Sequence, residues 1–433
     1  MPAIVHSLLY VTYLAVFAAL VMRHRFFGIE NTRRRHLLFF FLLKVAAGIG
    51  LTLVYTYYYT DQAKADIYRY FNDSRIISPL LFSQPVHWLK IMTGYGINDP
   101  ETFQYLLPTQ YFSHPGHDLV TNNTFIIRFN VLLNYFSCSN IFINTLFFNF
   151  ISFAALTRLY KALQPYFASF QQLLYVPLFL LPATLFWSAG LLKEALLFTG
   201  VSVYLHALLT SEEKTFKRVL SGTIGLLLLA LVKLQVAAIA LLCFTAFLCF
   251  RKRSNTSVFR LTAVAALLGL FYLLATEPLA KVLIGKRNEF IELAIHENAG
   301  SAFNTTLTEP TGINLLRLLP SSFVNAILRP FVWEPGKAFQ KIFGLENLFF
   351  LLLLLLPLRY FKFPQGERQL LFWGFLLFAL LNYLAIGITV PIMGAIVHYR
   401  VIAAPFLMLA ALLCVDLERL KGIKLTSAFT RYN

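Results

Sequence analysis

Long apolar runs separated by short polar segments recur along the whole chain of 433 residues. A helix needs about 20 apolar residues to cross the ~30 Å hydrocarbon core of a bilayer, because each residue adds about 1.5 Å. Seven runs fit one crossing each: Ile4–Met22, Leu37–Tyr59, Ile141–Tyr160, Phe259–Thr276, Asn347–Phe361, Leu370–Val390 and Arg400–Val415. The pattern therefore predicts an all-α fold, a polytopic bundle of transmembrane helices.

Two further apolar runs do not fit a single crossing. Gln172–Leu209 holds 38 residues, about 57 Å as one helix, and its prolines and a Ser-Ala-Gly turn predict a break between Trp187 and Glu194. Val219–Phe250 holds 32 residues, and we interpret it as two short helices around Lys233. With these two hairpins the chain has about eleven spans.

The distribution of basic residues orients these spans. Cytoplasmic connections of membrane proteins are enriched in Lys and Arg. With the N-terminus outside and the C-terminus cytoplasmic, the cytoplasmic segments carry 21 Lys and Arg against 6 Asp and Glu, and the outer segments carry 15 against 14. The first run has no Lys or Arg before Arg23, which favours a retained span over a signal peptide.

We predict one integral membrane domain over 1–433, with two large extracytoplasmic segments at 60–140 and 277–346. Both segments are rich in aromatic and apolar residues. Phe125–Phe136 and Leu315–Leu328 are amphipathic, which is typical of helices that lie in the membrane interface.

Composition supports the membrane interpretation. Hydrophobic residues make up 58% of the chain and charged residues 13%, and the mean hydropathy is +0.66, whereas soluble domains average about 25% charged residues. The net charge of +17 is spread over short segments beside the predicted spans, not gathered on one folded face. We therefore expect the lipid bilayer as partner and no nucleic acid. Four cysteines at unrelated spacings show no disulfide or zinc pattern.

The first candidate for chemistry follows the second span. Asp66, Tyr70 and Asp73 are spaced i, i+4 and i+7, and therefore share one face of a helix. A carboxylate at the outer membrane surface can act as general base on an acceptor hydroxyl. The alternative is an aromatic belt followed by solvated loop acids.

The second candidate is the predicted break in the long apolar run. Lys193 and Glu194 follow Gly190 there, and a helix that begins at this point presents N–H groups suited to an anion. The alternative is an intramembrane ion pair that locks the hairpin. Lys233 has the equivalent place in the next hairpin, although a snorkelling lysine gives the same pattern.

Arg329, His398 and Arg400 are candidate ligands for a substrate phosphate. Arg329 ends an apolar helix and can hold a phosphate bidentately, or can pair with Glu334. Arg400 can equally be an interfacial anchor. His114-Pro-Gly-His117-Asp118 and His296-Glu297 are weak metal patterns, and we predict no metal site.

The sequence resembles GT-C-type membrane glycosyltransferases, in particular members found in bacterial polysaccharide loci. The resemblance rests on the Asp-rich segment after an early span, on the runs Pro182–Glu194 and His398–Phe406, and on Arg329–Glu334 followed by Glu346-Asn347. These motifs are short and spread along most of the chain. One departure is that the acids follow the second span, not the first, so the resemblance implies an extra N-terminal helix or a different base.

The resemblance implies a multi-pass enzyme of the cell inner (cytoplasmic) membrane that moves a sugar from a polyprenyl-phosphate donor to a glycan, lipid or protein acceptor. Asp66 or Asp73 then acts as base, and cations such as Lys193, Arg329 and Arg400 neutralise the donor phosphate. It implies no particular cofactor and leaves a divalent metal open. Two alternatives stay open: a glycan polymerase similar to O-antigen polymerases, and a non-enzymatic transporter or flippase of lipid-linked sugars.

Overall fold

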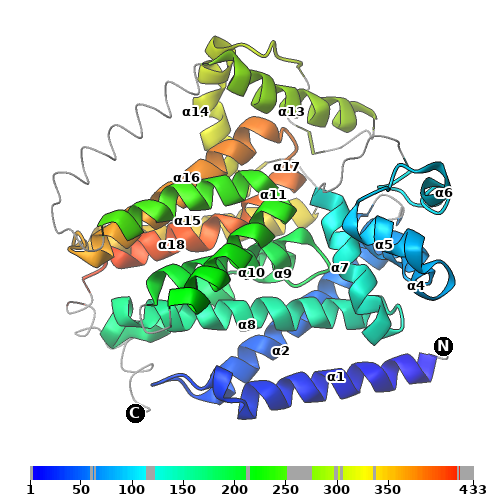
Figure 1. Cartoon of the computed structure of the whole chain (residues 1–433). Coiled ribbons are helices and arrows are strands. Elements are labelled where there is room, and N and C mark those ends of the chain that lie inside the picture. Colours follow the sequence, from blue (N-terminus) through cyan, green and yellow to red (C-terminus); the bar gives the residue numbers. More distant parts are fainter. Residues whose placement is uncertain are drawn as a thin grey trace. The chain divides into compact units, whose positions relative to one another are not determined.

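The computed structural model describes residues 3–58, 62, 65–113, 122–210, 215–250, 276–296, 301–302, 306–334, 338–416 and 419. Within these residues the regular structure is helical (Figure 1), and β-pairing is limited to isolated bridges such as the one between Ile29 and Thr32. This confirms the all-α prediction for the part of the chain that is described.

The chain divides into two compact units. Unit 1 comprises Met1–Leu163 and Leu185–Ala238, and unit 2 comprises Gln164–Thr184 and Ile239–Asn433. The helices that lie wholly or mainly in unit 1 are α1 (Ala3–Arg23), α2 (Arg34–Leu53), α3 (Asp66–Ile77), α4 (Leu80–Ser83), α5 (Pro85–Thr93), α6 (Pro100–Phe103), α7 (Asn122–Ser137), α8 (Ile141–Phe167) and α10 (Lys193–Leu209). α9 (Pro182–Trp187) and α11 (Thr215–Phe250) contribute to both units.

Unit 2 is organised around α16, which packs against α14 on one side and α18 on another. Its helices are α13 (Glu277–His296), α14 (Gly312–Leu328), α15 (Ala338–Arg359), α16 (Glu367–Thr389), α17 (Met393–Tyr399) and α18 (Ala404–Leu413). A Cβ at Gly387 of α16 would collide with the carbonyl oxygen of Ser322 on α14. The missing side chain therefore allows the two backbones to approach closely, as is common where membrane helices pack.

Among the described residues, five helices are long and apolar enough to cross a membrane: Ile4–Arg23, Arg34–Tyr57, Ile141–Phe167, Thr215–Phe244 and Glu367–Thr389. The pair Met393–Ile402 and Ala404–Leu413, bent by 50°, would make a sixth. The chain thus has the helices of a membrane protein. The predicted span Phe259–Thr276 lies, apart from Thr276, outside the described residues.

Both predicted breaks in the long apolar runs are confirmed. α9 ends at Trp187 and α10 begins at Lys193, so the backbone between them is not helical. Within α11, Lys233 has φ −159° and ψ 92°, an extended conformation that interrupts the helix. The segments 125–136 and 315–328 are helical as predicted, within α7 and α14.

The break before α10 is held against α2. Lys44 is buried in α2, and its ammonium donates hydrogen bonds to the carbonyl oxygen of Ser188 at 2.9 Å and to the hydroxyl of Ser188 at 2.7 Å. A Cβ at Gly48, one turn further along α2, would lie 2.5 Å from the carbonyl oxygen of Ala189. The Lys44 side chain thus supplies a hydrogen-bond donor to a carbonyl oxygen that the break leaves without a helical partner, and Gly48 allows α2 to approach the same segment closely.

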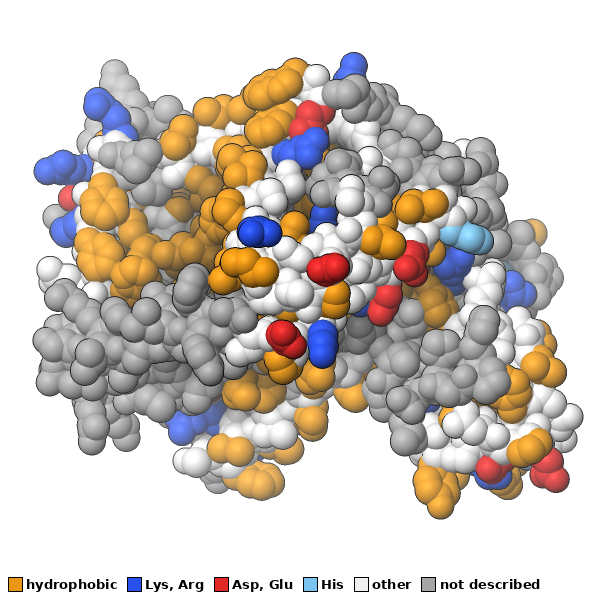
Figure 2. Space-filling model, turned by 90° about the horizontal axis from the view of Figure 1, so that it is seen from above, with side chains coloured by type: hydrophobic (Ala, Val, Ile, Leu, Met, Phe, Trp, Pro, Cys, Tyr) orange, Lys and Arg blue, Asp and Glu red, His pale blue; other side chains and the backbone are white. Residues whose placement is uncertain are grey.

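Large hydrophobic side chains remain exposed on the surface. Figure 2 shows hydrophobic side chains over much of one face, with acidic and basic side chains in smaller groups between them. Ile4 and Phe82 are each 81% exposed. Exposed apolar surface on this scale is typical of contact with lipid.

Candidate functional site

The predicted acidic face of α3 contacts Tyr111, a residue without a recognisable pattern in the sequence. Asp66 accepts a hydrogen bond from the Tyr111 hydroxyl, with 3.0 Å between the oxygens. The ring of Tyr70 stacks on that of Tyr111 at a centroid distance of 5.3 Å. Asp73 accepts a hydrogen bond from the Tyr111 backbone N–H at 2.9 Å. The prediction that Asp66, Tyr70 and Asp73 share a helical face is therefore confirmed.

Asp73 has the surroundings of a structural residue. Its side chain is 1% exposed, and its two carboxylate oxygens accept hydrogen bonds from the backbone N–H groups of Gln110 and Tyr111, each at 2.9 Å. Burial raises the pKa of Asp73, while these two N–H groups and the charge of Arg69 lower it. Because both oxygens are engaged, Asp73 fixes the segment around Tyr111 to α3.

Asp66 is placed differently. It is the first residue of α3 and is only partly buried. Burial, followed by the charge of Asp66 and the hydrogen bond to it, raises the pKa of Tyr111, against a smaller opposing effect of Arg69. The Tyr111 hydroxyl therefore stays protonated and donates a hydrogen bond to Asp66. This bond uses one oxygen, and an ionised carboxylate accepts several hydrogen bonds.

Lys193 joins the same group from the start of α10. Its ammonium nitrogen lies 5.7 Å from the centroid of the Tyr70 ring, within the range of a cation–π interaction. The Tyr70 hydroxyl in turn donates to the side-chain oxygen of Asn123 at 3.2 Å. We call Asp66, Tyr70, Tyr111 and Lys193 the Asp66 cluster. It combines a carboxylate and an ammonium, carried by elements more than 100 positions apart in the sequence.

Glu194, which follows Lys193 in the sequence, interacts with a different residue. Its side chain is 2% exposed. Glu194 interacts electrostatically with Lys233, the residue at which α11 breaks. The structure therefore links the two predicted breaks through opposite charges, whereas the alternative predicted from the sequence paired Glu194 with its neighbour Lys193.

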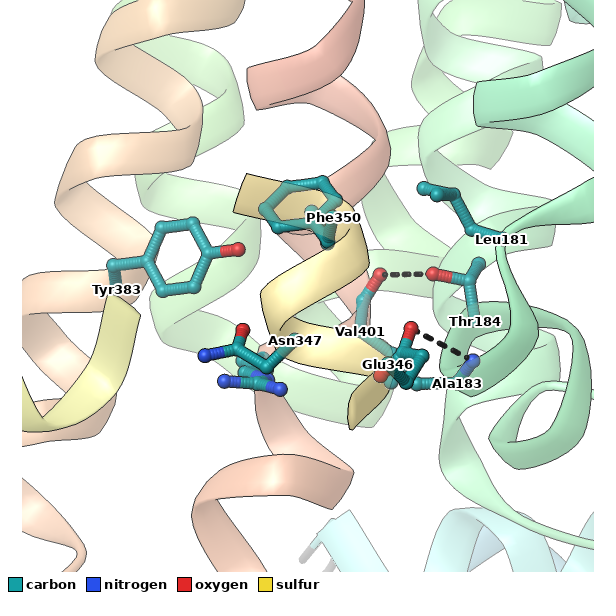
Figure 3. A pocket seen from close by; sticks show the side chains of 10 residues that line it. Leu181, Ala183, Thr184, Glu346, Asn347, Phe350, Tyr383 and Val401 are labelled. Carbon is teal, nitrogen blue, oxygen red and sulfur yellow. Dashed lines mark hydrogen bonds between the residues drawn. The ribbon is translucent and has the colours of Figure 1, made fainter. Parts of the chain in front are cut away.

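Unit 2 contains a separate pocket lined by both apolar and polar side chains, with an empty volume of about 280 Å³ that includes open solvent. Figure 3 shows Glu346 and Asn347 of α15, Tyr383 of α16 and the Ala183–Thr184 segment around it. The Ala183 N–H donates to Oε1 of Glu346 at 3.1 Å. Arg400 also lines the pocket and interacts electrostatically with Glu346 and Tyr383.

Arg329 and Arg400 both make bonds within the protein. Nε of Arg329 and Oε1 of Glu334 are 2.5 Å apart, so the ion-pair alternative is observed. Arg400 is 4% exposed and donates to the carbonyl oxygen of Arg329 at 2.6 Å. His398 is also buried, and its ring lies 5.1 Å from that of Tyr399.

The predicted site residues thus fall into two groups. Unit 1 brings Asp66, Asp73 and Lys193 together through Tyr70 and Tyr111, with Glu194 and Lys233 as a neighbouring charge pair. Unit 2 links Arg329 to Arg400, with His398 two residues before Arg400. Tyr111 had no signal in the sequence, because it lies outside any periodic pattern.

No group of three or more His, Cys, Asp or Glu suited to a metal ion occurs among the described residues. His114, His117, Asp118 and Glu297, which belong to the two metal patterns, lie outside them. Comparison of the chain with protein-family models, with curated proteins and with solved structures finds no match.

Proposed function

We propose that this protein is a membrane glycosyltransferase of the cell inner (cytoplasmic) membrane. It moves a sugar from a polyprenyl-phosphate-type donor to a glycan, lipid or protein acceptor at the extracytoplasmic face. The observation that carries the proposal is the Asp66 cluster, in which a partly buried carboxylate and a lysine ammonium share one pair of stacked tyrosines. The resemblance to GT-C-type enzymes supports the same assignment.

The four residues of the Asp66 cluster have separate roles in this proposal. The acceptor hydroxyl oxygen attacks the anomeric carbon of the donor sugar while its proton passes to Asp66 as general base. The bond from the anomeric carbon to the phosphate oxygen breaks, and the phosphate leaves with the electron pair. Lys193 stabilises the charge that develops on this leaving group. Tyr111 orients Asp66 through its hydrogen bond.

The contacts of Asp73 favour Asp66 over Asp73 as the base. Two backbone N–H groups already occupy the Asp73 carboxylate, and its side chain is buried. The ion pair of Arg329 with Glu334 gives Arg329 a structural role in the same way.

The proposal includes the eleven-span topology with the N-terminus outside. In unit 1, α3 to α7 follow the C-terminal end of α2, and Lys193 reaches Tyr70 of α3 from the first turn of α10. Any topology that places α3 outside therefore places Lys193 there as well. A break at Lys233 agrees with two short spans within Thr215–Phe250.

The test measures lipid-linked sugars and finished glycan in cells that carry Asp66→Asn, with Glu101→Gln as a matched control. Glu101 is an exposed acid of the same outer segment and lies outside the cluster. We expect Asp66→Asn to accumulate the donor, to lose the product and to fold at the normal level, and Glu101→Gln to behave as wild type. Lys193→Ala should lose most product, and Lys193→Arg should recover part of it.

A normal amount of product from folded Asp66→Asn protein would contradict the proposal. If product is instead lost only in Arg400→Gln, the polymerase alternative is favoured, because Arg400 and Glu346 line the separate pocket of unit 2. An unchanged glycan together with a donor retained on one side of the membrane would favour the transporter.

A further inference from the structure

A second group of ionisable side chains lies at the other end of unit 1, far from the Asp66 cluster. Arg34 begins α2, and its guanidinium donates to the carbonyl oxygen of Met22 at 2.6 Å. Lys161 of α8 donates to the carbonyl oxygen of Phe26. Figure 1 shows the C-terminal end of α1, the N-terminal end of α2 and the C-terminal end of α8 at the same end of this unit. α2 and its π-helical continuation span residues 34–58, about 35 Å in length.

Two more groups complete this basic cluster, which we define as Arg34, Arg158, Lys161 and His206. Arg158 and Lys161 are spaced i, i+3 on α8 and therefore share a face. Lys161 interacts electrostatically with Arg34 and Arg158. His206, in the last turn of α10, interacts with Arg158 and Lys161. Two helices, α2 and α8, thus bring three cations together, and His206 of α10 lies beside them.

The members of the basic cluster are not simply solvated surface charges. Arg34, Arg158 and Lys161 are partly buried, and His206 is 8% exposed. Partial burial weakens the screening of like charges by water and salt. Holding the cluster together therefore favours the binding of a counter-anion.

Carboxylates are scarce in the sequence segments that form the cluster. Residues 119–193, which include α8, contain no Asp or Glu. Glu30, which is exposed, is the only acid in residues 1–60. Glu212 and Glu213 follow α10 and lie outside the described residues.

We propose that the basic cluster binds a phosphate-bearing anion, either the headgroup of an anionic phospholipid or free phosphate. An arginine guanidinium matches two phosphate oxygens, and a lysine adds a point charge. Basic pockets between helices on the cytoplasmic side of membrane proteins bind such headgroups. This site is separate from the proposed transferase site, so either proposal can fail alone.

A simpler interpretation is that these cations only cap helix ends. Arg34 does bond to a carbonyl oxygen in the last turn of α1, and Lys161 to one just after it, and cations are favourable there. Helix capping explains each of these two hydrogen bonds when it is taken alone. It does not account for the convergence of Arg34, Arg158 and Lys161, because each added charge repels the others.

The test uses the purified full-length protein in nanodiscs of phosphatidylcholine, alone or with phosphatidylglycerol, and follows thermal unfolding and the number of phospholipids retained in native mass spectrometry. We expect phosphatidylglycerol to raise the melting temperature of the wild type. Arg158→Gln and Lys161→Ala should each weaken its apparent affinity about fivefold, the effect of one basic residue near an anionic surface. Lys217→Ala, which removes an exposed lysine of α11 from the same predicted side, should leave it unchanged.

The outcomes separate the two sources of the phosphate group. Inorganic phosphate that stabilises the wild type in phosphatidylcholine alone, and not Arg158→Gln, would identify free phosphate. Stabilisation by phosphatidylglycerol only would identify the lipid. If neither ligand stabilises the wild type, or if Lys217→Ala weakens binding as much as the cluster variants, the proposal is wrong. Should Lys161→Ala fail to fold, Arg158→Lys keeps the charge and should retain part of the binding.

Discussion

Asp73 accepts a hydrogen bond from the backbone N–H of Tyr111 at 2.9 Å, and so fixes the position of the residue whose hydroxyl reaches Asp66. Two acids seven positions apart on α3 thereby act on one tyrosine in different ways. One holds its backbone and the other receives its side-chain proton in a hydrogen bond. The base that we propose is oriented by this arrangement.

Replacement of Asp73 by asparagine is expected to lower stability. The amide NH₂ of Asp73→Asn would face one of the two backbone N–H donors, leaving a buried donor without its acceptor. We expect a loss of about 1–3 kcal/mol in the free energy of unfolding. Thermal unfolding of the purified protein measures it, and Asp66→Asn provides the comparison with little expected loss. Equal melting of Asp73→Asn and wild type would show that these bonds do not hold the segment.

The packing of α2 can be tested with two glycines one half-turn apart. A Cβ at Gly48 would lie 2.5 Å from both the Ala189 carbonyl oxygen and the Asn149 side-chain nitrogen, whereas a Cβ at Gly50 meets nothing within 4 Å. We expect Gly48→Ala to lose about 1–3 kcal/mol of stability from overpacking. Gly50→Ala should be neutral or stabilising. The yield of folded protein in detergent and its melting temperature report both effects, and similar behaviour of the two variants would refute the close approach.

The charge pair of Glu194 and Lys233 predicts strong coupling between two distant positions. Loss of one partner leaves a buried charge uncompensated, which typically costs about 3–5 kcal/mol. Lys233→Met and Glu194→Gln should therefore each destabilise the protein, and the double variant should be more stable than the sum of the single effects allows. Chemical unfolding of all four proteins gives the coupling energy. Strictly additive losses would mean that the two residues do not stabilise each other.

The ion pair between Arg329 and Glu334 allows a test of whether Arg329 stabilises the fold or binds the substrate phosphate. If the 2.5 Å contact is structural, Arg329→Gln and Glu334→Gln should lower stability alike, with a coupling energy of about 0.5–3 kcal/mol in a double-mutant cycle. Product formation should then follow the amount of folded protein in both variants. Loss of product in Arg329→Gln alone, with normal folding, would instead assign Arg329 to the substrate.

The predicted orientation can be tested with a native thiol. Cys138, just after α7, is exposed, while Cys243 and Cys414 are buried. In the proposed topology Cys138 belongs to the outer segment 60–140, so a membrane-impermeant maleimide should label it in intact cells whose outer barrier admits the reagent. Cys138→Ser is the control and should abolish that labelling. Labelling of Cys138 only after the reagent is given access to the cytoplasmic side would indicate the opposite topology.

Local physics decides several of the helices, and these could be predicted from the sequence alone. A run of apolar residues has few alternatives to a helix in a bilayer, so α1, α2, α8 and α16 could be predicted from length and hydropathy. The breaks after Trp187 and at Lys233 were predictable as well, because runs of these lengths do not match one membrane thickness. Periodicity also placed Asp66, Tyr70 and Asp73 on one face.

Only the tertiary structure decided which partners those residues contact. Tyr111 joins Asp66, Tyr70 and Asp73 from 38 to 45 positions away, and no periodicity relates it to them. Glu194 interacts with Lys233 of another helix, which leaves its neighbour Lys193 to reach Tyr70. A chain encodes helix length and amphipathic faces in neighbouring residues. The partner of a charge or hydroxyl depends instead on which helices pack together, and only the folded protein specifies that.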